Sequence, residues 1–184
     1  MSATTERTII DRYQDFRTRR FLKREHTYAN ALSGWRTQRR RRMLVVGLAV
    51  TFAFMAFVSL LCAFGLDWAP LLWFPACLVF FPLWSVLQIV SGRQGDAPRD
   101  ALDEFELAQR NSARSIGLTV TQTLMLLPIF YLVFGSTFFT DMSAETALGM
   151  AYAGALMALT VLLIGGCLPA MILGWTRRSD AEDA

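Results

Sequence analysis

The sequence predicts an all-α integral membrane protein with four transmembrane helices, an N-terminal amphipathic arm on the cytoplasmic side, and a cytoplasmic helical extension before the third span. Of its 184 residues, 54% are hydrophobic and 18% are charged, so the charges must be segregated from the apolar segments. Apolar runs occur at about 44–66, 71–90, 115–139 and 146–175. Each reaches the roughly 20 residues that cross a hydrocarbon core about 30 Å thick. We therefore place a four-helix transmembrane domain at 44–178.

The N-terminal segment, residues 1–43, is predicted to be a basic amphipathic arm. It holds twelve basic and four acidic residues, and Ile9, Tyr13 and Phe16 recur at helical spacing. Basic residues with aromatic anchors suit an anionic membrane surface. We expect the arm to bind anionic lipid or a protein partner, although a solvated tail that only fixes orientation explains the same charge. Nucleic acid is not an expected partner, because no nucleic-acid-binding motif accompanies the basic residues.

A run of arginines joins the arm to the first span, and we expect it to set the topology and to contact lipid headgroups. Its members are Arg39, Arg40, Arg41 and Arg42. Of the 18 basic residues, twelve precede the first span, four lie in the loop 91–114 and two follow the last span. The positive-inside rule therefore supports four spans with both termini cytoplasmic. The acidic tail, residues 179–184, is then cytoplasmic as well.

The type of membrane is inferred from composition alone. Lys23 is the only lysine among the 18 basic residues. A strong preference for arginine is common in GC-rich bacterial genomes, so we expect a multi-pass protein of a bacterial inner (cytoplasmic) membrane.

Small side chains recur at helical spacing in the first and fourth spans. Such faces allow another helix to approach closely. In the first span they are Ala49, Ala53, Ala56 and Ser59. In the fourth span they include Gly149, Ala153, Gly154 and Ala158. We expect these residues to make helix-packing or partner contacts, with the fourth span as a tightly packed centre or a subunit contact.

Prolines are predicted to distort three of the spans. Pro75 and Pro82 should kink the second span, and Pro128 should kink the third. The fourth apolar run is longer than a straight crossing requires and contains the segment 165–169, Gly-Gly-Cys-Leu-Pro. We expect a break or a strong tilt there.

The third span is predicted to carry the most polar intramembrane segment. A helix that starts near residue 98 should run through the end of the loop and into this span. A polar line enters this helix from the cytoplasmic side on one face, formed by Asn111, Ser115, Thr119 and Gln122, and Thr123 follows it. A glutamine in hydrocarbon needs a hydrogen-bond partner. These residues are interpreted either as contacts between helices or as part of a polar substrate path.

The sequence offers no catalytic, cofactor or metal site. The predicted spans contain no Asp, Glu, Lys, Arg or His, the residues that proton relays and coupled transport need within a bilayer. The only histidine, His26, lies in the arm, and Cys62, Cys77 and Cys167 do not have metal-binding spacing. We interpret Cys62 and Cys77 as buried apolar fillers, with a disulfide between them as the alternative.

Taken with the charge pattern, these features predict a non-catalytic accessory or assembly subunit of a larger inner-membrane complex, with a respiratory or other energy-transducing complex as the first candidate host. The expected partners are other membrane-protein subunits and anionic lipids, and no small-molecule substrate is identified. The alternative is a small homo-oligomeric transporter or channel with a polar path near Thr119 and Gln122. An enzyme that acts on lipid at the interface would need an acid or base such as Asp103 or Glu106.

Overall fold

The computed structural model describes residue 16 and residues 37–66, 68–90, 104–138 and 142–176. The long helices in these ranges are α2 (Gln38–Ala63), α3 (Trp73–Val90), α4 (Glu104–Phe138) and α5 (Ala144–Thr176), and a short 3-10 helix, η2 (Ala69–Leu72), precedes α3. Four helical segments have the length and apolar composition to cross a membrane: α2, α4, α5 and Ala69–Val90, which joins η2 to α3. The described residues contain no strand. The prediction of an all-helical, multi-pass membrane protein is confirmed at this level.

Several predictions fall outside the described residues. They concern the amphipathic arm up to residue 36, the beginning of the helical extension in 91–103, and the acidic tail 179–184. The side of the membrane on which the two termini lie also stays a prediction.

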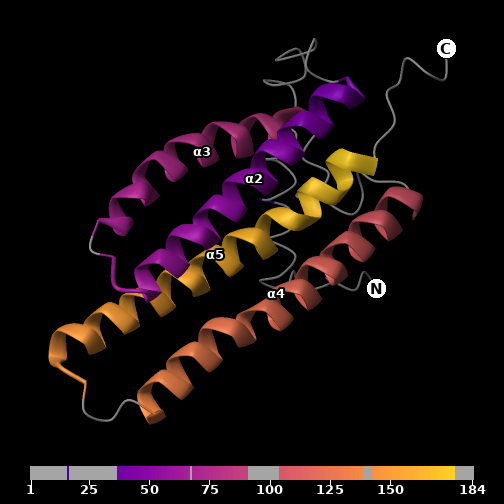
Figure 1. The fold of residues 1–184 in the computed structure, drawn as a ribbon. Coiled ribbons are helices and arrows are strands. Elements are labelled where there is room, and N and C mark those ends of the chain that lie inside the picture. The colour runs from indigo at the N-terminus through magenta and orange to yellow at the C-terminus, as the bar shows by residue number, and fades with distance from the viewer. Residues whose placement is uncertain (1–15, 17–36, 67, 91–103, 139–141, 177–184) are drawn as a thin grey trace, which may run out of the picture.

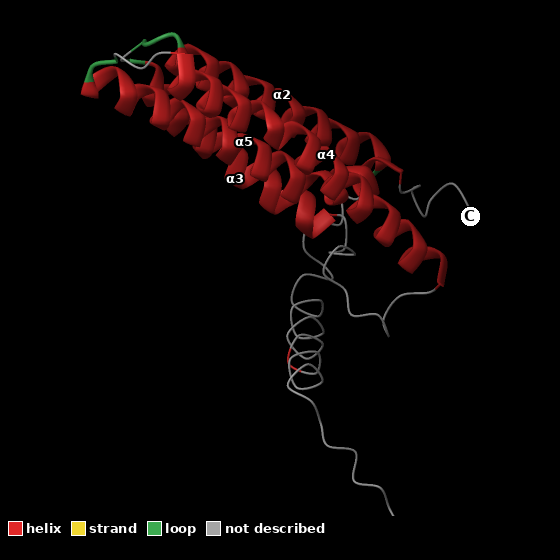
Figure 2. Cartoon of the chain, turned by 90° about the horizontal axis from the view of Figure 1, so that it is seen from below, coloured by secondary structure: helices red, strands yellow, loops and turns green. Residues whose placement is uncertain are grey.

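The four long helices lie side by side in the order α3, α2, α5, α4 (Figure 1). α5 packs against both α4 and α2, α2 packs against α3, and a smaller contact joins α3 to α5. Figure 2 shows that the helices run along a common direction, with the α2–α3 and α4–α5 connections at the same end. α2 and α5 are therefore the central helices of a layer, and α3 and α4 are its outer helices.

The ends of α2 differ from those predicted for the first span. The helix begins at Gln38, so the arginine run belongs to the helix, as suits a residue with high helix propensity. The Arg41 amide donates to the Thr37 carbonyl at 3.1 Å. The helix ends at Ala63, and Gly65 then adopts a φ of 77°, a left-handed conformation that glycine tolerates and that turns the chain toward η2.

The prolines are accommodated within the helices. Pro75 lies in the first turn of α3, where a missing backbone N–H breaks no helical hydrogen bond. Pro82 lies inside α3, which is bowed in Figure 1. The predicted break at 165–169 is wrong, because α5 is a continuous helix from Ala144 to Thr176 with Pro169 inside it.

α5 continues past Pro169 because the facing residue of α4, Gly117, has no side chain. A Cβ at Gly117 would lie 3.0 Å from the Pro169 Cγ and 3.3 Å from the Gly165 carbonyl oxygen. This carbonyl is the one that the missing N–H of Pro169 would otherwise have satisfied. The backbone of α4 covers it, so the helix can carry the proline without opening to lipid.

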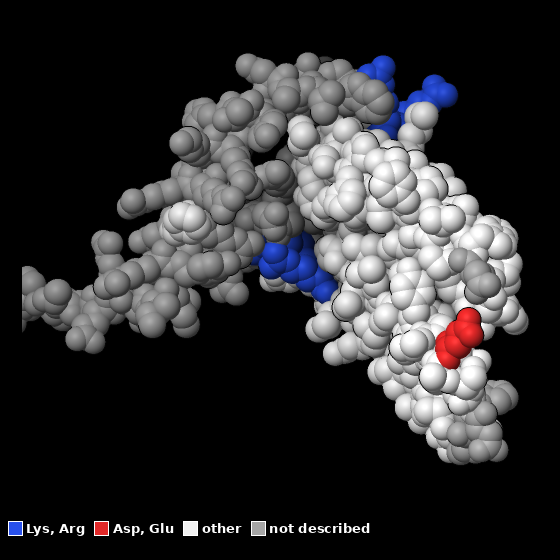
Figure 3. All heavy atoms as spheres, turned by 90° about the vertical axis from the view of Figure 1, so that its left-hand side faces the viewer, with Lys and Arg blue, Asp and Glu red and all other residues white. Residues whose placement is uncertain are grey.

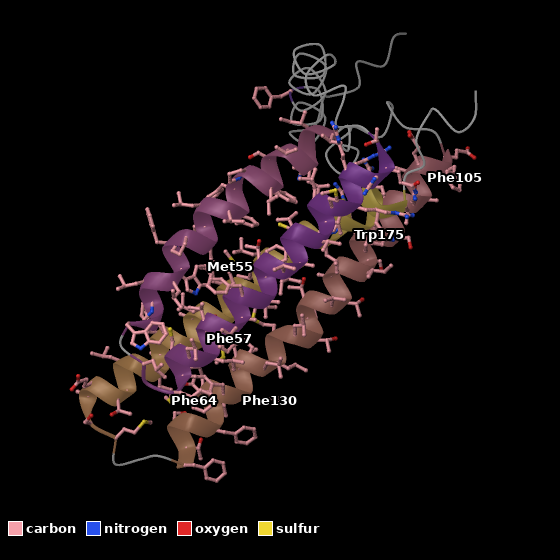
Figure 4. All side chains as sticks on the ribbon, turned by 45° about the horizontal axis from the view of Figure 1, so that its top comes forward. Met55, Phe57, Phe64, Phe105, Phe130 and Trp175 are labelled. Atoms are coloured by element: carbon pink, nitrogen blue, oxygen red, sulfur yellow. The ribbon has the colours of Figure 1, made fainter. Side chains whose placement is uncertain are left out.

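The apolar core lies between α2, α3 and α5. Leu48, Met55 and Leu87 are fully buried in it. Met55 lies between the helices in Figure 4, whereas Phe57 and Phe130 lie on the outer surface. In the most apolar stretch of α4, only 11% of the residues are buried, compared with 39% in α2 and 44% in α5. α4 therefore stands at the edge of the layer with most of its surface exposed.

Candidate interaction surfaces

The described part of the chain holds few groupings of chemically active side chains. The described residues contain no cluster of three or more His, Cys, Asp or Glu side chains. Cys62, Cys77 and Cys167 are free thiols, so the disulfide considered for the first two is not formed. Glu106 is half-buried in the first turn of α4, and Asp103 lies outside the described residues. On the face shown in Figure 3, basic side chains lie in two separate places and a small acidic patch lies apart from both, with uncharged surface between them.

The arginine run at the start of α2 divides between the interior and the surface. Arg41 is only 3% exposed, whereas Arg39, Arg40 and Arg42 are exposed. The guanidinium carbon of Arg42 lies 5.1 Å from the centroid of the Trp175 ring, a cation–π contact that links α2 to α5. Three arginines thus face outward at the end of the layer where lipid headgroups are predicted.

An open hollow runs along α2 beside the exposed arginines. Its lining includes Gln38, Arg39, Arg42, Met43, Val46 and Gly47. The charged residues lie at the start of the helix, and the apolar ones follow one to two turns further into the predicted span. A guanidinium group followed by apolar surface suits the phosphate of a lipid headgroup and the first part of its acyl chain.

Some of the small residues singled out in the first and fourth spans pack inside the chain. Ser59, Ala153 and Gly154 are all buried. The Ser59 hydroxyl lies 3.4 Å from that of Thr160, between α2 and α5. A Cβ at Gly154 would lie 2.6 Å from the Leu132 Cδ2, so the glycine allows α4 to approach α5. These residues serve contacts between helices of the same chain.

The other small residues of this set lie at or near the surface. Ala56 and Ala158 are half-buried, and Ala49, Ala53 and Gly149 are exposed. Among the described residues, no heavy atom comes within 4 Å of the position that a Cβ would take at Gly149. Ala49, Ala53 and Gly149 are therefore open to a neighbouring molecule, and their predicted partner role stays a prediction.

The polar residues predicted within the third span lie on the outer side of α4. Thr119, Gln122 and Thr123 are all exposed, and so is Ser115 one turn before them. Gly117, which packs against α5, is two residues from both Ser115 and Thr119. Two residues are slightly more than half a turn at about 3.6 residues per turn. These polar side chains therefore point away from α5 and are not covered by the other described helices.

The contacts of α5 give the depth of these polar residues in the membrane. Trp175 is a typical interfacial residue at the predicted cytoplasmic end of α5. Gly165, ten residues earlier, lies against Thr121 of α4. At about 1.5 Å per residue, Thr121 is about 15 Å below the level of Trp175. If Trp175 marks the membrane interface, we expect Gln122, the next residue, near the middle of a hydrocarbon core about 30 Å thick.

Two features of these helices were not predicted from the sequence: the burial of Arg110 in α4, and the close approach of α4 and α5 at Gly117 and Gly165. Arg110 is only 4% exposed in α4, and a buried arginine has no signature in the sequence. Gly117 and Gly165 bring the two helices together, and a Cβ at Gly165 would overlap the Thr121 hydroxyl. A signal for the glycines was present, because glycine inside an apolar helix is typical of close helix–helix approach.

Comparison of the chain with protein-family models, curated proteins and solved structures found no match. The function is therefore inferred from the surfaces themselves. Those surfaces are the exposed small residues of the central helices, the arginine run, and the outward polar residues of α4.

Proposed function

We propose that this chain is a non-catalytic accessory or assembly subunit of a larger bacterial inner-membrane complex, with a respiratory or other energy-transducing complex as the first candidate host. The observation that carries the proposal is the exposure of small side chains on the two central helices. Ala49 and Ala53 on α2 and Gly149 on α5 are exposed. Small residues on a membrane-spanning face let a neighbouring helix pack closely.

The layered arrangement supports a role in assembly. Among the described helices, α2 and α5 are the central pair, so the outer helices α3 and α4 present wide apolar surfaces. The predicted spans contain no Asp, Glu, Lys, Arg or His, the residues from which proton relays and ion paths are usually built. The spans can therefore contact another molecule chiefly through close packing and through a few neutral hydrogen-bonding side chains.

The cytoplasmic end supplies a second kind of contact in this proposal. Arg39 and Arg42 border the hollow along α2, where a guanidinium group can bind the phosphate of an anionic lipid. The basic arm that precedes α2 is proposed to act as a clamp on the same membrane surface or on a partner subunit. The arm and the hollow would then hold the chain in register with its neighbours.

A second candidate is a homo-oligomeric transporter or channel. It is favoured by the position of Gln122, a neutral hydrogen-bonding residue at membrane depth. Thr119, Gln122 and Thr123 form only one wall of a possible path, because they point away from the other helices of the chain. Further copies would have to supply the remaining walls.

Affinity purification from native membranes in a mild detergent tests the leading proposal. Mass spectrometry should find a fixed set of other membrane polypeptides with the tagged chain. Ala53→Leu adds bulk to an exposed small position and should lower the recovery of those polypeptides at equal levels of tagged chain. Val50→Leu is the matched control, because Val50 is exposed on the same helix and is already bulky.

Two results would contradict the proposal. Recovery of this chain alone would favour the homo-oligomeric candidate. Equal recovery of the other polypeptides with Ala53→Leu and Val50→Leu would show that the exposed small residues of α2 do not form the contact.

A further inference from the structure

Four polar side chains on the outer side of α4 form what we call the α4 polar face. They are Ser115, Thr119, Gln122 and Thr123. Several other hydroxyl groups in the helices donate to the carbonyl four residues earlier, as Thr121 does to Gly117 at 2.6 Å and Thr160 to Leu156 at 2.8 Å. Within the part of the chain that the structure describes, no side chain of the α4 polar face makes a hydrogen bond. The face therefore has unused hydrogen-bonding capacity.

This capacity lies where lipid cannot satisfy it. Gln122 is near the middle of the bilayer core, judged from the contact between Thr121 and Gly165. Lipid tails neither donate nor accept hydrogen bonds, so an amide at that depth is stabilised by a protein partner. The occupant of the α4 polar face must therefore bring hydrogen-bonding groups of its own to the same depth.

We infer that this occupant is α4 of a second copy of the chain, related to the first by a two-fold axis along the membrane normal. Serine, threonine and glutamine side chains each donate and accept hydrogen bonds. The α4 polar face is neutral and built only of such groups, so it is complementary to itself. Copies inserted in the same orientation place each Gln122 level with the partner's Gln122, where the two amides can pair.

The spacing of the hydroxyl residues allows the two helices to come close. Ser115, Thr119 and Thr123 follow one another at intervals of four residues. Small residues at this interval form a track along which the backbones of two membrane helices can pack. The same spacing keeps Gln122 at the edge of the track, where its longer side chain can cross to the other helix.

The dimer leaves the packing within each chain unchanged. The α4 polar face lies on the side of α4 opposite Gly117, which contacts α5. α4 is an outer helix of the layer, so a second layer can join it edge to edge. The inference goes beyond the proposed function and does not depend on it, because an accessory subunit can enter its complex as a dimer.

The test uses the full chain, purified and reconstituted in liposomes. Thr119→Cys should form a disulfide-linked dimer on mild oxidation, because the two-fold axis brings each Thr119 close to the partner's Thr119. Leu78→Cys is the control, since Leu78 is 60% exposed on α3, at the opposite edge of the layer. The chain without an added cysteine gives the background from its own half-buried Cys77.

A second measurement gives the strength of the contact in the same liposomes. Energy transfer between labelled chains at increasing dilution in lipid yields the dimer dissociation constant. Gln122→Leu should raise this constant about 3- to 30-fold, the range expected for loss of an interhelical hydrogen bond. Thr137→Val should not change it, because the Thr137 hydroxyl already donates to Val133 of its own helix at 2.7 Å. Circular dichroism of each variant checks that the helices form.

Three results would overturn the inference. Thr119→Cys could give no more linked dimer than Leu78→Cys. Gln122→Leu could dimerise as tightly as the natural chain. In native membranes, the same cysteine could link to a different polypeptide, which would make that polypeptide the occupant of the α4 polar face. The first two results do not bear on whether other subunits co-purify with the chain, so the dimer can fail while the accessory role stands.

Discussion

Substitution of Gly165 by alanine tests the contact that holds α4 to the rest of the protein. α4 packs chiefly against α5, so its position depends on this one interface. A Cβ at Gly165 would lie 2.8 Å from the Thr121 Cβ, an atom fixed to the backbone of α4 that cannot rotate away. Gly165→Ala should therefore separate the two helices locally.

The expected size of the effect follows from that distance. Non-bonded carbon atoms rest about 3.5–4.0 Å apart, so the helices must move by about 0.7 Å or more. Overpacking of this kind costs about 1–3 kcal/mol of stability. Replacing a helical glycine by alanine returns about 0.5–1 kcal/mol through backbone entropy. Gly166→Ala is the control variant. It gains the same stability from backbone entropy, and no heavy atom of the described residues lies within 4 Å of its new Cβ, so it causes no overpacking.

The difference between these two variants isolates the overpacking. SDS-induced unfolding of the purified chain in mixed micelles, followed by far-UV circular dichroism, gives the free energy of unfolding of each. Gly165→Ala should be less stable than Gly166→Ala by about 1–3 kcal/mol. Equal stability of the two variants would refute the close α4–α5 packing described here.

Four further predictions rest on the described contacts and on the charge pattern. Alkylation of the denatured chain should add three groups with or without prior reduction, because all three cysteines are free; a gain on reduction would reveal a disulfide. Ser59→Ala should lower the free energy of unfolding by less than about 1 kcal/mol, because the Thr160 hydroxyl still donates to its own helix. Ser59→Leu should prevent folding, since Ser59 is fully buried, and normal expression of it would count against the α2–α5 contact. Replacement of all four arginines at 39–42 by serine should give a mixed topology, with a C-terminal reporter found on both sides of the membrane. A single orientation would show that the other basic residues are enough to set the topology.

The helices could be predicted from the sequence, because an apolar run of about 20 residues in a bilayer must satisfy its own backbone hydrogen bonds, and a helix does so within one segment. It also predicted that Thr119 and Gln122 share a helix face. It could not show which side of the helix packs inside the protein. In a water-soluble protein, polar residues mark the outer face of a helix and apolar residues the inner face. Lipid is as apolar as the protein core, so polarity does not tell that Gly117 faces inward and Leu118 outward.

The same limit explains the small residues and the proline. Gly154 packs against α4 and Ala53 faces outward, although both belong to small-residue patterns of similar appearance. The predicted break near Pro169 did not occur because a residue far away in sequence, Gly117, accommodates it. Close packing between helices depends on pairs of residues from different segments, and a single sequence does not show which segments meet.

The most direct test of the account is the mass of the native assembly, measured by native mass spectrometry after extraction in a mild detergent. One chain has a mass of 20.7 kDa. A chain that supplies contact surfaces to a larger complex should be found in a particle that also contains other polypeptides in fixed proportion. A particle whose mass is a whole-number multiple of 20.7 kDa, with no other polypeptide in it, would contradict the proposed role.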